Sequence, residues 1–132
     1  MSRDAGDFAL SPDGRQAAIV VRGELFVYDV AESGESQNAG DANRITDTPQ
    51  REKDPHWSPD GRWLYFVSDR EGQEDVYRVR SADSADTRLS RALRTVTERL
   101  TRDPLPETRP TPSPDGRTVA FVRGNGDLWL MD

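Results

Sequence analysis

The sequence predicts an all-β protein built from three repeated units of short antiparallel strands. Three observations predict this fold class. The pentapeptide Ser-Pro-Asp-Gly-Arg begins at Ser11, Ser58 and Ser113. A short run rich in β-branched and aromatic residues follows each copy, and a polar turn then leads to a second such run. Self-similarity at a regular spacing indicates an array of equivalent structural units.

Each copy of the Ser-Pro-Asp-Gly motif predicts a tight hairpin. Proline presets the backbone for the second position of the turn, and aspartate can accept a hydrogen bond from a nearby backbone N–H. Glycine accepts the left-handed conformation that ends the turn, and the serine hydroxyl can bond back into it. The motif residues are Ser11, Pro12, Asp13 and Gly14; Ser58, Pro59, Asp60 and Gly61; and Ser113, Pro114, Asp115 and Gly116.

Each unit is expected to hold four strands, with the hairpin joining the first strand to the second. First strands are expected at 8–10, 56–57 and 111–112, and second strands at 18–21, 64–67 and 119–122. Third strands, each opening on an acidic residue, are expected at 24–28, 75–79 and 127–131. Fourth strands carry an Arg-[Ile/Leu]-Thr motif, which occurs twice, at 44–46 and 99–101.

Fixed offsets between the motifs support one domain of three units, at about 7–46, 54–101 and 109–132. Within the second and third units Glu52 matches Glu107, and Pro55 matches Pro110. The polar segment 31–43 predicts an exposed loop. The segment 81–97 has Leu89, Leu93 and Val96 at helical spacing, but its polarity favours a loop insertion with one helical turn.

The repeated W-SPDG-R, β run, D-[LV]-[YFW] and R-[LI]-T pattern resembles the WD-like β-propeller repeats of the TolB and tricorn-protease group. The stretches "ALSPDGRQAAIVVRGELFVYDV" and "RITDTPQREKDPHWSPDGRWLYFVSDREGQEDVYRV" carry the closest likeness, to the N-terminal propeller of tricorn-like serine peptidases. The resemblance implies three four-stranded propeller blades. It also implies that the catalytic residues of such a peptidase lie in domains outside this chain.

The third unit has no fourth strand before the sequence ends at Asp132. Propellers close with about four to eight blades. We therefore expect a partial propeller from a longer chain, or a half-ring that is completed by self-association of two copies.

Composition excludes several classes of function. The net charge of −6 argues against a non-specific nucleic-acid interface and against docking on an anionic membrane. The chain has no cysteine, so thiol nucleophiles and cysteine-ligated metals are excluded. No apolar run is long enough to cross a membrane, and the first residues lack the apolar core of a signal peptide.

No catalytic residue and no cofactor are expected in this chain. A nucleophilic serine needs a base within hydrogen-bond reach, and three equivalent serines cannot share the single histidine, His56. The acids Glu24, Asp75 and Asp127 hold one repeated position, so we expect them to bond arginine or backbone groups between strands. Metal binding by His56 would need companions at a recognised spacing, which are missing.

Three residues are predicted to contribute to binding. His56 and Trp57 lie on a first strand, which can face the channel of a propeller, and Trp63 has no aromatic counterpart in the other units. The expected function is a non-catalytic propeller region of a tricorn-like serine peptidase that binds or gates peptides. The alternative is a TolB-like cell-envelope propeller that binds protein partners.

Overall fold

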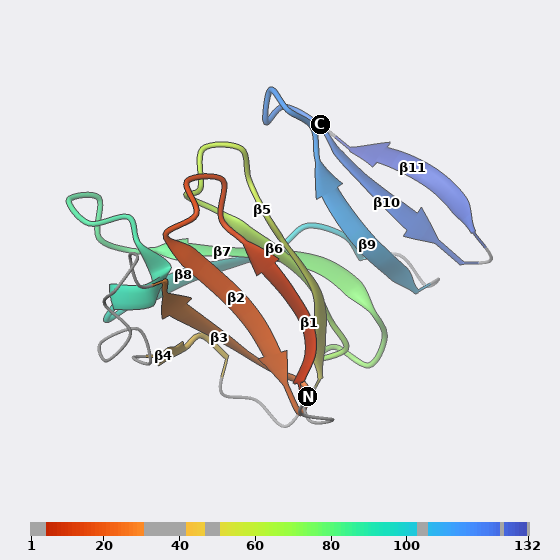
Figure 1. Ribbon diagram of the computed structural model, residues 1–132. Coiled ribbons are helices and arrows are strands. Elements are labelled where there is room, and N and C mark those ends of the chain that lie inside the picture. Colours follow the sequence, from red (N-terminus) through yellow and green to blue (C-terminus); the bar gives the residue numbers. More distant parts are fainter. Residues whose placement is uncertain (1–4, 31–41, 47–50, 103–105, 125, 132) are drawn as a thin grey trace.

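The chain forms three antiparallel β-sheets that lie side by side like blades (Figure 1). The computed structural model describes residues 5–30, 42–46, 51–102, 106–124 and 126–131. Within them the only helical element is the short 3-10 turn η1 (Leu89–Arg91). The all-β, blade-like architecture predicted from the repeats is therefore confirmed.

The sheets contain four, four and three described strands. The first sheet comprises β1 (Ala5–Leu10), β2 (Gln16–Val21), β3 (Glu24–Asp29) and β4 (Ala42–Arg44) in that order. The second comprises β5 (Glu52–Trp57), β6 (Leu64–Ser68), β7 (Asp75–Ser81) and β8 (Thr95–Arg99). The third comprises β9 (Glu107–Pro112), β10 (Val119–Arg123) and β11 (Asp127–Met131), with β10 in the middle.

The three Ser-Pro-Asp-Gly turns have the same geometry. In the second copy, Asp60 Oδ1 accepts hydrogen bonds from Ser58 Oγ at 2.6 Å and from the Arg62 N–H at 3.0 Å. The Trp63 N–H donates to Ser58 Oγ at 3.0 Å, which closes the turn. Gly61 has φ of 74°, a left-handed conformation that glycine adopts without a steric cost. The same bonds recur in the copies that begin at Ser11 and Ser113.

Burial along the second strand of each sheet follows from the position of the sheet in the array. All five residues of β6 are buried, whereas buried and half-buried residues alternate along β2. The second sheet packs between the other two, so both faces of β6 are covered. A strand covered on both faces loses the alternation that a half-exposed strand shows.

The main core lies between the first and second sheets. Its fully buried members include Leu25 and Val27 from β3 together with Leu64 and Phe66 from β6. Leu89 of η1 joins the same core, although it belongs to the insertion before β8.

The insertion reaches back to the first sheet. The Asn43 side chain donates to Leu89 O at 2.8 Å and to Ala92 O at 2.7 Å. Ser90 Oγ donates to Asp29 Oδ1 at 2.6 Å. The segment thus forms a loop with one helical turn, as predicted. Its hydrogen bonds connect the second blade to the first. Leu93, which stands at helical spacing from Leu89 in the sequence, is fully exposed, as a loop allows.

Residues 31–41 of the expected loop 31–43 lie outside the described residues. Trp129 of the third sheet is half exposed because β11 pairs only with β10 among the described strands. Its ring instead lies beneath the guanidinium of Arg123, at 4.1 Å.

Candidate functional site

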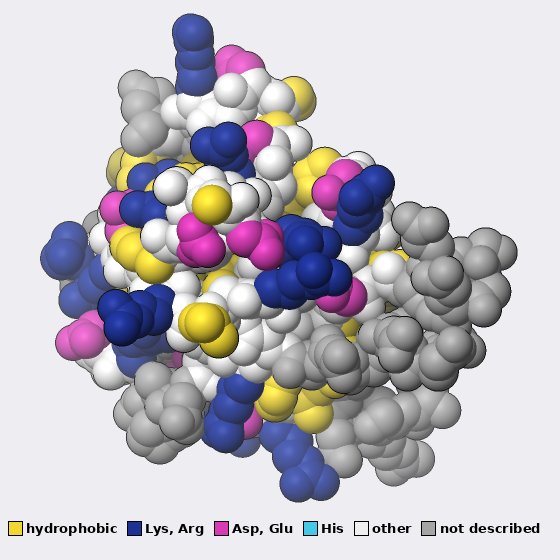
Figure 2. Space-filling model, turned by 90° about the vertical axis from the view of Figure 1, so that its left-hand side faces the viewer, with side chains coloured by type: hydrophobic (Ala, Val, Ile, Leu, Met, Phe, Trp, Pro, Cys, Tyr) yellow, Lys and Arg dark blue, Asp and Glu magenta, His cyan; other side chains and the backbone are white. Residues whose placement is uncertain are grey.

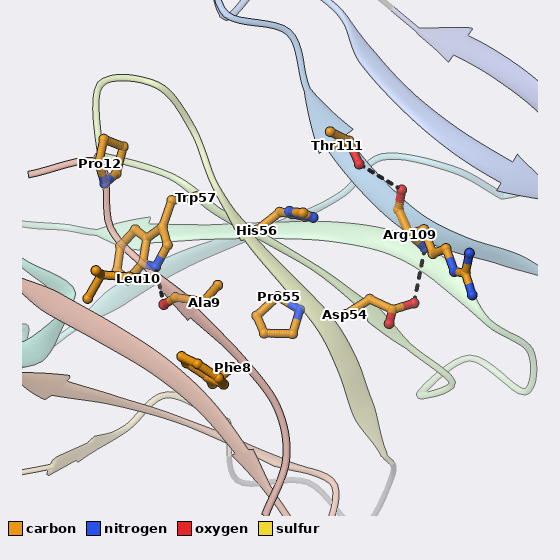
Figure 3. A pocket seen from close by; sticks show the side chains of 10 residues that line it. All are labelled: Phe8, Ala9, Leu10, Pro12, Asp54, Pro55, His56, Trp57, Arg109 and Thr111. Atoms are coloured by element: carbon orange, nitrogen blue, oxygen red, sulfur yellow. Dashed lines mark hydrogen bonds between the residues drawn. The ribbon is translucent and has the colours of Figure 1, made fainter. Parts of the chain in front are cut away.

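A hollow of about 600 Å³ opens where the first strands of the three blades meet (Figure 3). β1 lies beside β5, and β5 lies beside β9, so each blade contributes one strand to its wall. Phe8, Leu10 and Trp57 give the hollow an apolar side. His56, Arg109 and Thr111 give it a polar side. Concave sites of mixed apolar and polar lining are the usual form of ligand sites.

The hollow is shaped by a bulge repeated in β5 and β9. The pairing register of both strands shifts at this point, and Asp54 and Arg109 have φ of 53° and 56°. These residues hold equivalent positions, four residues before Ser58 and Ser113. Asp54 Oδ2 accepts a hydrogen bond from the Arg109 N–H at 3.0 Å, so the bulges lock neighbouring blades together. Left-handed backbone at non-glycine residues is strained and is found often at functional sites.

His56 is half-buried and projects into the hollow between β5 and β9 (Figure 3). Burial lowers the pKa of His56, while the nearby Asp54 carboxylate acts in the opposite direction. The imidazole is therefore neutral at neutral pH and offers one donor and one acceptor. Among the described residues no hydrogen bond joins it to the motif serines, whose hydroxyls are engaged in their turns.

Trp57 shapes the wall of the hollow rather than projecting into it. Its indole is largely buried, and Nε1 donates to Ala9 O of β1 at 2.9 Å. This bond ties the first strands of two blades together. Phe8 and Leu10 of β1 are the exposed apolar residues beside it, at 73% and 56% exposure. Exposed apolar side chains at the rim of a hollow favour contact with an apolar group of a ligand.

Trp63 lies away from this hollow. The guanidinium of Arg78 lies over its ring at 3.8 Å and that of Arg80 at 5.4 Å, and Arg62 lies beside it in a smaller cavity of about 230 Å³. The structure thus brings His56 and Trp57 together and leaves Trp63 elsewhere. All three remain predicted binding residues.

Sequence reasoning missed the roles of Asp54 and Arg109. Their equivalent offsets from the turns were available as a signal, but only the backbone geometry reveals the bulge. Arg109 places a permanent positive charge on the polar side of the hollow. Its guanidinium forms no ion pair with an acid in the described part of the chain.

Two of the three repeated acids are paired within their blades. Glu24 accepts a hydrogen bond from Arg44 of β4, and Asp75 accepts from Arg99 of β8 at 2.5 Å. These contacts join the third and fourth strands, as expected, whereas the exposed Asp127 forms no such pair among the described residues. Across the face in Figure 2, acidic and basic side chains are interspersed, with scattered apolar side chains between them.

Within the described ranges, no three His, Asp or Glu side chains gather as a metal site would require. No helix in this part of the chain has the length and apolar character needed to span a membrane.

The chain resembles three curated proteins. It is 33% identical over 121 residues to an uncharacterized protein of Agrobacterium fabrum, covering 90% of this chain and 36% of that protein. It is 33% identical over 132 residues to the uncharacterized peptidase YuxL of Bacillus subtilis, covering 92% and 18%. It is 33% identical over 72 residues to the Tol-Pal system protein TolB of Syntrophus aciditrophicus, covering 54% and 16%. No family model matches the chain.

Solved structures give the same picture. A candidate TolB from Agrobacterium tumefaciens superposes with a TM-score of 0.71 at 30% identity, covering 93% of this chain and 43% of that one. TolB from Acinetobacter baumannii superposes with a TM-score of 0.67 at 26% identity, covering 96% and 29%. The chain therefore spans less than half the length of each relative and solved structure that it matches.

Proposed function

Because this chain belongs to the TolB-like β-propeller family, we propose that it is a protein-interaction region. In this proposal the hollow between β1, β5 and β9 binds a peptide segment of a partner protein. The single observation that carries the proposal is the hollow itself, where three blades contribute both apolar and polar side chains. The backbone bulges and the hydrogen bond from Trp57 to Ala9 fix the walls of the hollow in the ligand-free protein. A preformed site loses less entropy on binding.

The lining indicates the chemistry of the segment that fits. Phe8 and Leu10 offer exposed apolar surface on one side. Arg109 offers a fixed positive charge on the other, and the neutral imidazole of His56 lies between them. A peptide with an apolar or aromatic residue close to an acidic side chain would match both sides. Such a ligand also avoids the general repulsion that an acidic chain of net charge −6 exerts on longer acidic segments.

A displayed peptide library tests the proposal. Immobilised wild-type protein is expected to enrich peptides that pair an apolar residue with an acidic one. The variants Phe8→Ser and Arg109→Glu are expected to weaken binding of the enriched peptides at least tenfold, because each removes one side of the site. The matched control is Arg117→Glu, which makes the same charge change at an exposed turn outside the lining residues.

The outcome is decisive in either direction. Equal loss in Arg109→Glu and Arg117→Glu would show that only net charge matters. Enriched peptides that bind both hollow variants as tightly as the wild type would place the binding surface elsewhere.

A second candidate is a peptide-gating propeller region of a tricorn-like serine peptidase. The match to a peptidase of Bacillus subtilis over 92% of this chain favours it. Under this proposal the chain itself cleaves no peptide, and a peptidase region in the same protein performs the cleavage. Blocking the hollow by Arg109→Glu in the whole protein would then alter cleavage of long peptides and spare short ones. Peptide hydrolysis by the present chain alone would contradict both candidates.

A further inference from the structure

Two buried glutamates occupy equivalent places at the two junctions between blades. Glu52 opens β5 and Glu107 opens β9, and both side chains are essentially inaccessible to solvent. Their backbone N–H groups donate to the preceding blade, to Gly23 O at 2.7 Å and to Glu74 O at 2.8 Å. Each carboxyl group is therefore fixed in the seam between consecutive blades.

The preceding blade presents a threonine to each glutamate. Thr46 Oγ1 accepts a hydrogen bond from the Leu25 N–H at 3.0 Å, and Thr101 Oγ1 accepts from the Val76 N–H at 2.9 Å. Each threonine hydroxyl also acts to lower the pKa of the glutamate that it faces. The Thr of the repeated Arg-[Ile/Leu]-Thr motif thus belongs to the seam.

The two seams differ in the charge that faces the glutamate. Arg123 of β10 donates to Glu107 Oε2 from Nε at 3.0 Å and from Nη2 at 2.9 Å. Asp75 also faces Glu107, and it has its own guanidinium partner in Arg99. The second seam therefore holds two carboxyl groups and two guanidinium groups.

In the first seam a hydroxyl stands where the second has a guanidinium. Ser68 of β6, equivalent to Arg123, donates from Oγ to Glu52 Oε2 at 2.7 Å. The guanidinium of Arg70 forms only a long ion pair with Glu52 Oε2, at 3.9 Å, which is too long for a hydrogen bond. It lies over the Tyr77 ring at 4.7 Å and donates from Nε to Ser68 Oγ at 3.0 Å. Glu52 Oε1 and the equivalent Glu107 Oε1 both lack a hydrogen-bond partner among the described residues, so the seams differ in the donor to Oε2 and not at Oε1.

We propose that the seam between the first two blades is a proton-controlled joint. The packing of the two blades is stable while Glu52 is a neutral acid and is weakened when Glu52 ionises. The second seam closes instead through the ion pair of Glu107 with Arg123. The physical reason is that a buried carboxylate is tolerated when a charged donor pairs with it and is strongly disfavoured without one.

The surroundings of Glu52 support the direction of the effect. Burial raises the pKa of Glu52, and Asp69 adds to the rise, while Ser68, Thr46 and Arg70 act against it. Burial raises the pKa of Glu107 as well, and Asp75 adds to the rise, while Thr101 and Arg123 act against it. The pKa shifts therefore have the same direction in both seams, and the contrast lies in the donor to Oε2, a hydroxyl in the first seam and a guanidinium in the second. The polar and charged groups around Glu52 come from four places. Lys53 and Asp54 follow it on β5, Ser68 ends β6, Asp69 and Arg70 come directly after β6, and Thr46 comes from the first blade. Arg51 and Glu74 line the same cavity as Glu52, and Glu74 pairs with Lys53.

The sign of the pH dependence follows from a raised pKa. The contribution of Glu52 to stability is complete below the ordinary pKa of 4.5 and is lost as the pH rises through the raised value. The first seam is therefore expected to tighten in acid and to loosen towards neutral and alkaline pH.

The test compares the wild type with Glu52→Gln, whose amide resembles the neutral acid. Denaturant unfolding is measured from pH 4 to pH 9. Between the ordinary pKa of 4.5 and the raised pKa of Glu52, the unfolding equilibrium constant of the wild type is expected to rise relative to the variant by up to about tenfold per pH unit. Below and above that window the ratio of the two constants is expected to be independent of pH.

Two control variants separate the joint from a general effect of burial. Ser68→Arg supplies the guanidinium that the second seam has, and it is expected to flatten the pH dependence. Glu107→Gln removes the anion that Arg123 pairs with, so it is expected to destabilise the protein without flattening that dependence.

A carbon-13 titration of the Glu52 carboxyl group in the wild type gives a direct reading that needs no variant to fold. A midpoint well above the ordinary glutamate value supports the joint. A midpoint at or below that value, or a Glu52→Gln variant with the same pH dependence as the wild type, would overturn the proposal.

Discussion

Replacing Ser58 by alanine should destabilise the protein through the loss of a specific turn. Ser58 is buried at 5% exposure, and its hydroxyl makes two hydrogen bonds. It donates to Asp60 at 2.6 Å and accepts from the Trp63 N–H at 3.0 Å. The alanine variant leaves that N–H without its acceptor in a place that water reaches poorly.

The magnitude follows from the cost of an unsatisfied donor. An orphaned buried N–H costs about 1–3 kcal/mol, so Ser58→Ala should lower the free energy of unfolding by that amount. Ser113 makes the same bonds in the third turn, at 2.5 Å and 3.1 Å, but is only half-buried. Water can replace its hydroxyl, so Ser113→Ala should cost less than about 1 kcal/mol.

Urea unfolding of the two variants beside the wild type measures both free energies, since an unchanged slope with denaturant shows that only stability changed. The reasoning depends on the difference between the sites. If Ser113→Ala costs as much as Ser58→Ala, burial of the turn does not set the cost. If neither variant is destabilised, the hydroxyl bonds contribute nothing and the structural interpretation of the motif is refuted.

Three further predictions concern acid stability, the insertion and assembly. Hydrogen bonds from the Ser11 hydroxyl and from the Arg15 N–H hold the pKa of Asp13 below its usual 3.8, so the turn loses this stabilisation as the pH falls through the lowered value. Asp13→Asn should therefore reduce the loss of stability that circular dichroism detects between about pH 4 and pH 2. Leu89→Ala should cost about 2–5 kcal/mol in urea unfolding because Leu89 is buried in the core, whereas Leu93→Ala should be neutral because Leu93 is fully exposed. If two copies complete a ring, light scattering should give twice the chain mass of 14.8 kDa; a folded monomer would contradict self-association.

The repeats made the order of strands and turns predictable. The turn chemistry of Ser-Pro-Asp-Gly is local, because it depends on the φ of proline and glycine and on bonds between residues at most five apart. The sequence also predicted that Asp75 bonds an arginine or a backbone group between strands, and the structure identifies the partner as Arg99.

The candidate site was only partly predictable. His56 and Trp57 were chosen for their place on a first strand, and they do line the hollow. Arg109 was missed because its conformation arises from a bulge, and its neighbours at the hollow come from the other two blades. Trp63 was chosen for lacking a counterpart, yet two arginines of its own blade cover its ring.

By itself the sequence determined the number of blade units, the order of their strands and the geometry of their turns. These properties depend on contacts within one repeat, where the residues concerned are close along the chain. The tertiary structure alone decided what the seams and the hollow contain. Ser68 and Arg123 occupy the same repeat position, but one leaves Glu52 facing a hydroxyl and the other gives Glu107 a counter-ion. That difference affects stability only because neighbouring blades bury both glutamates. At an exposed position water would solvate either carboxyl group.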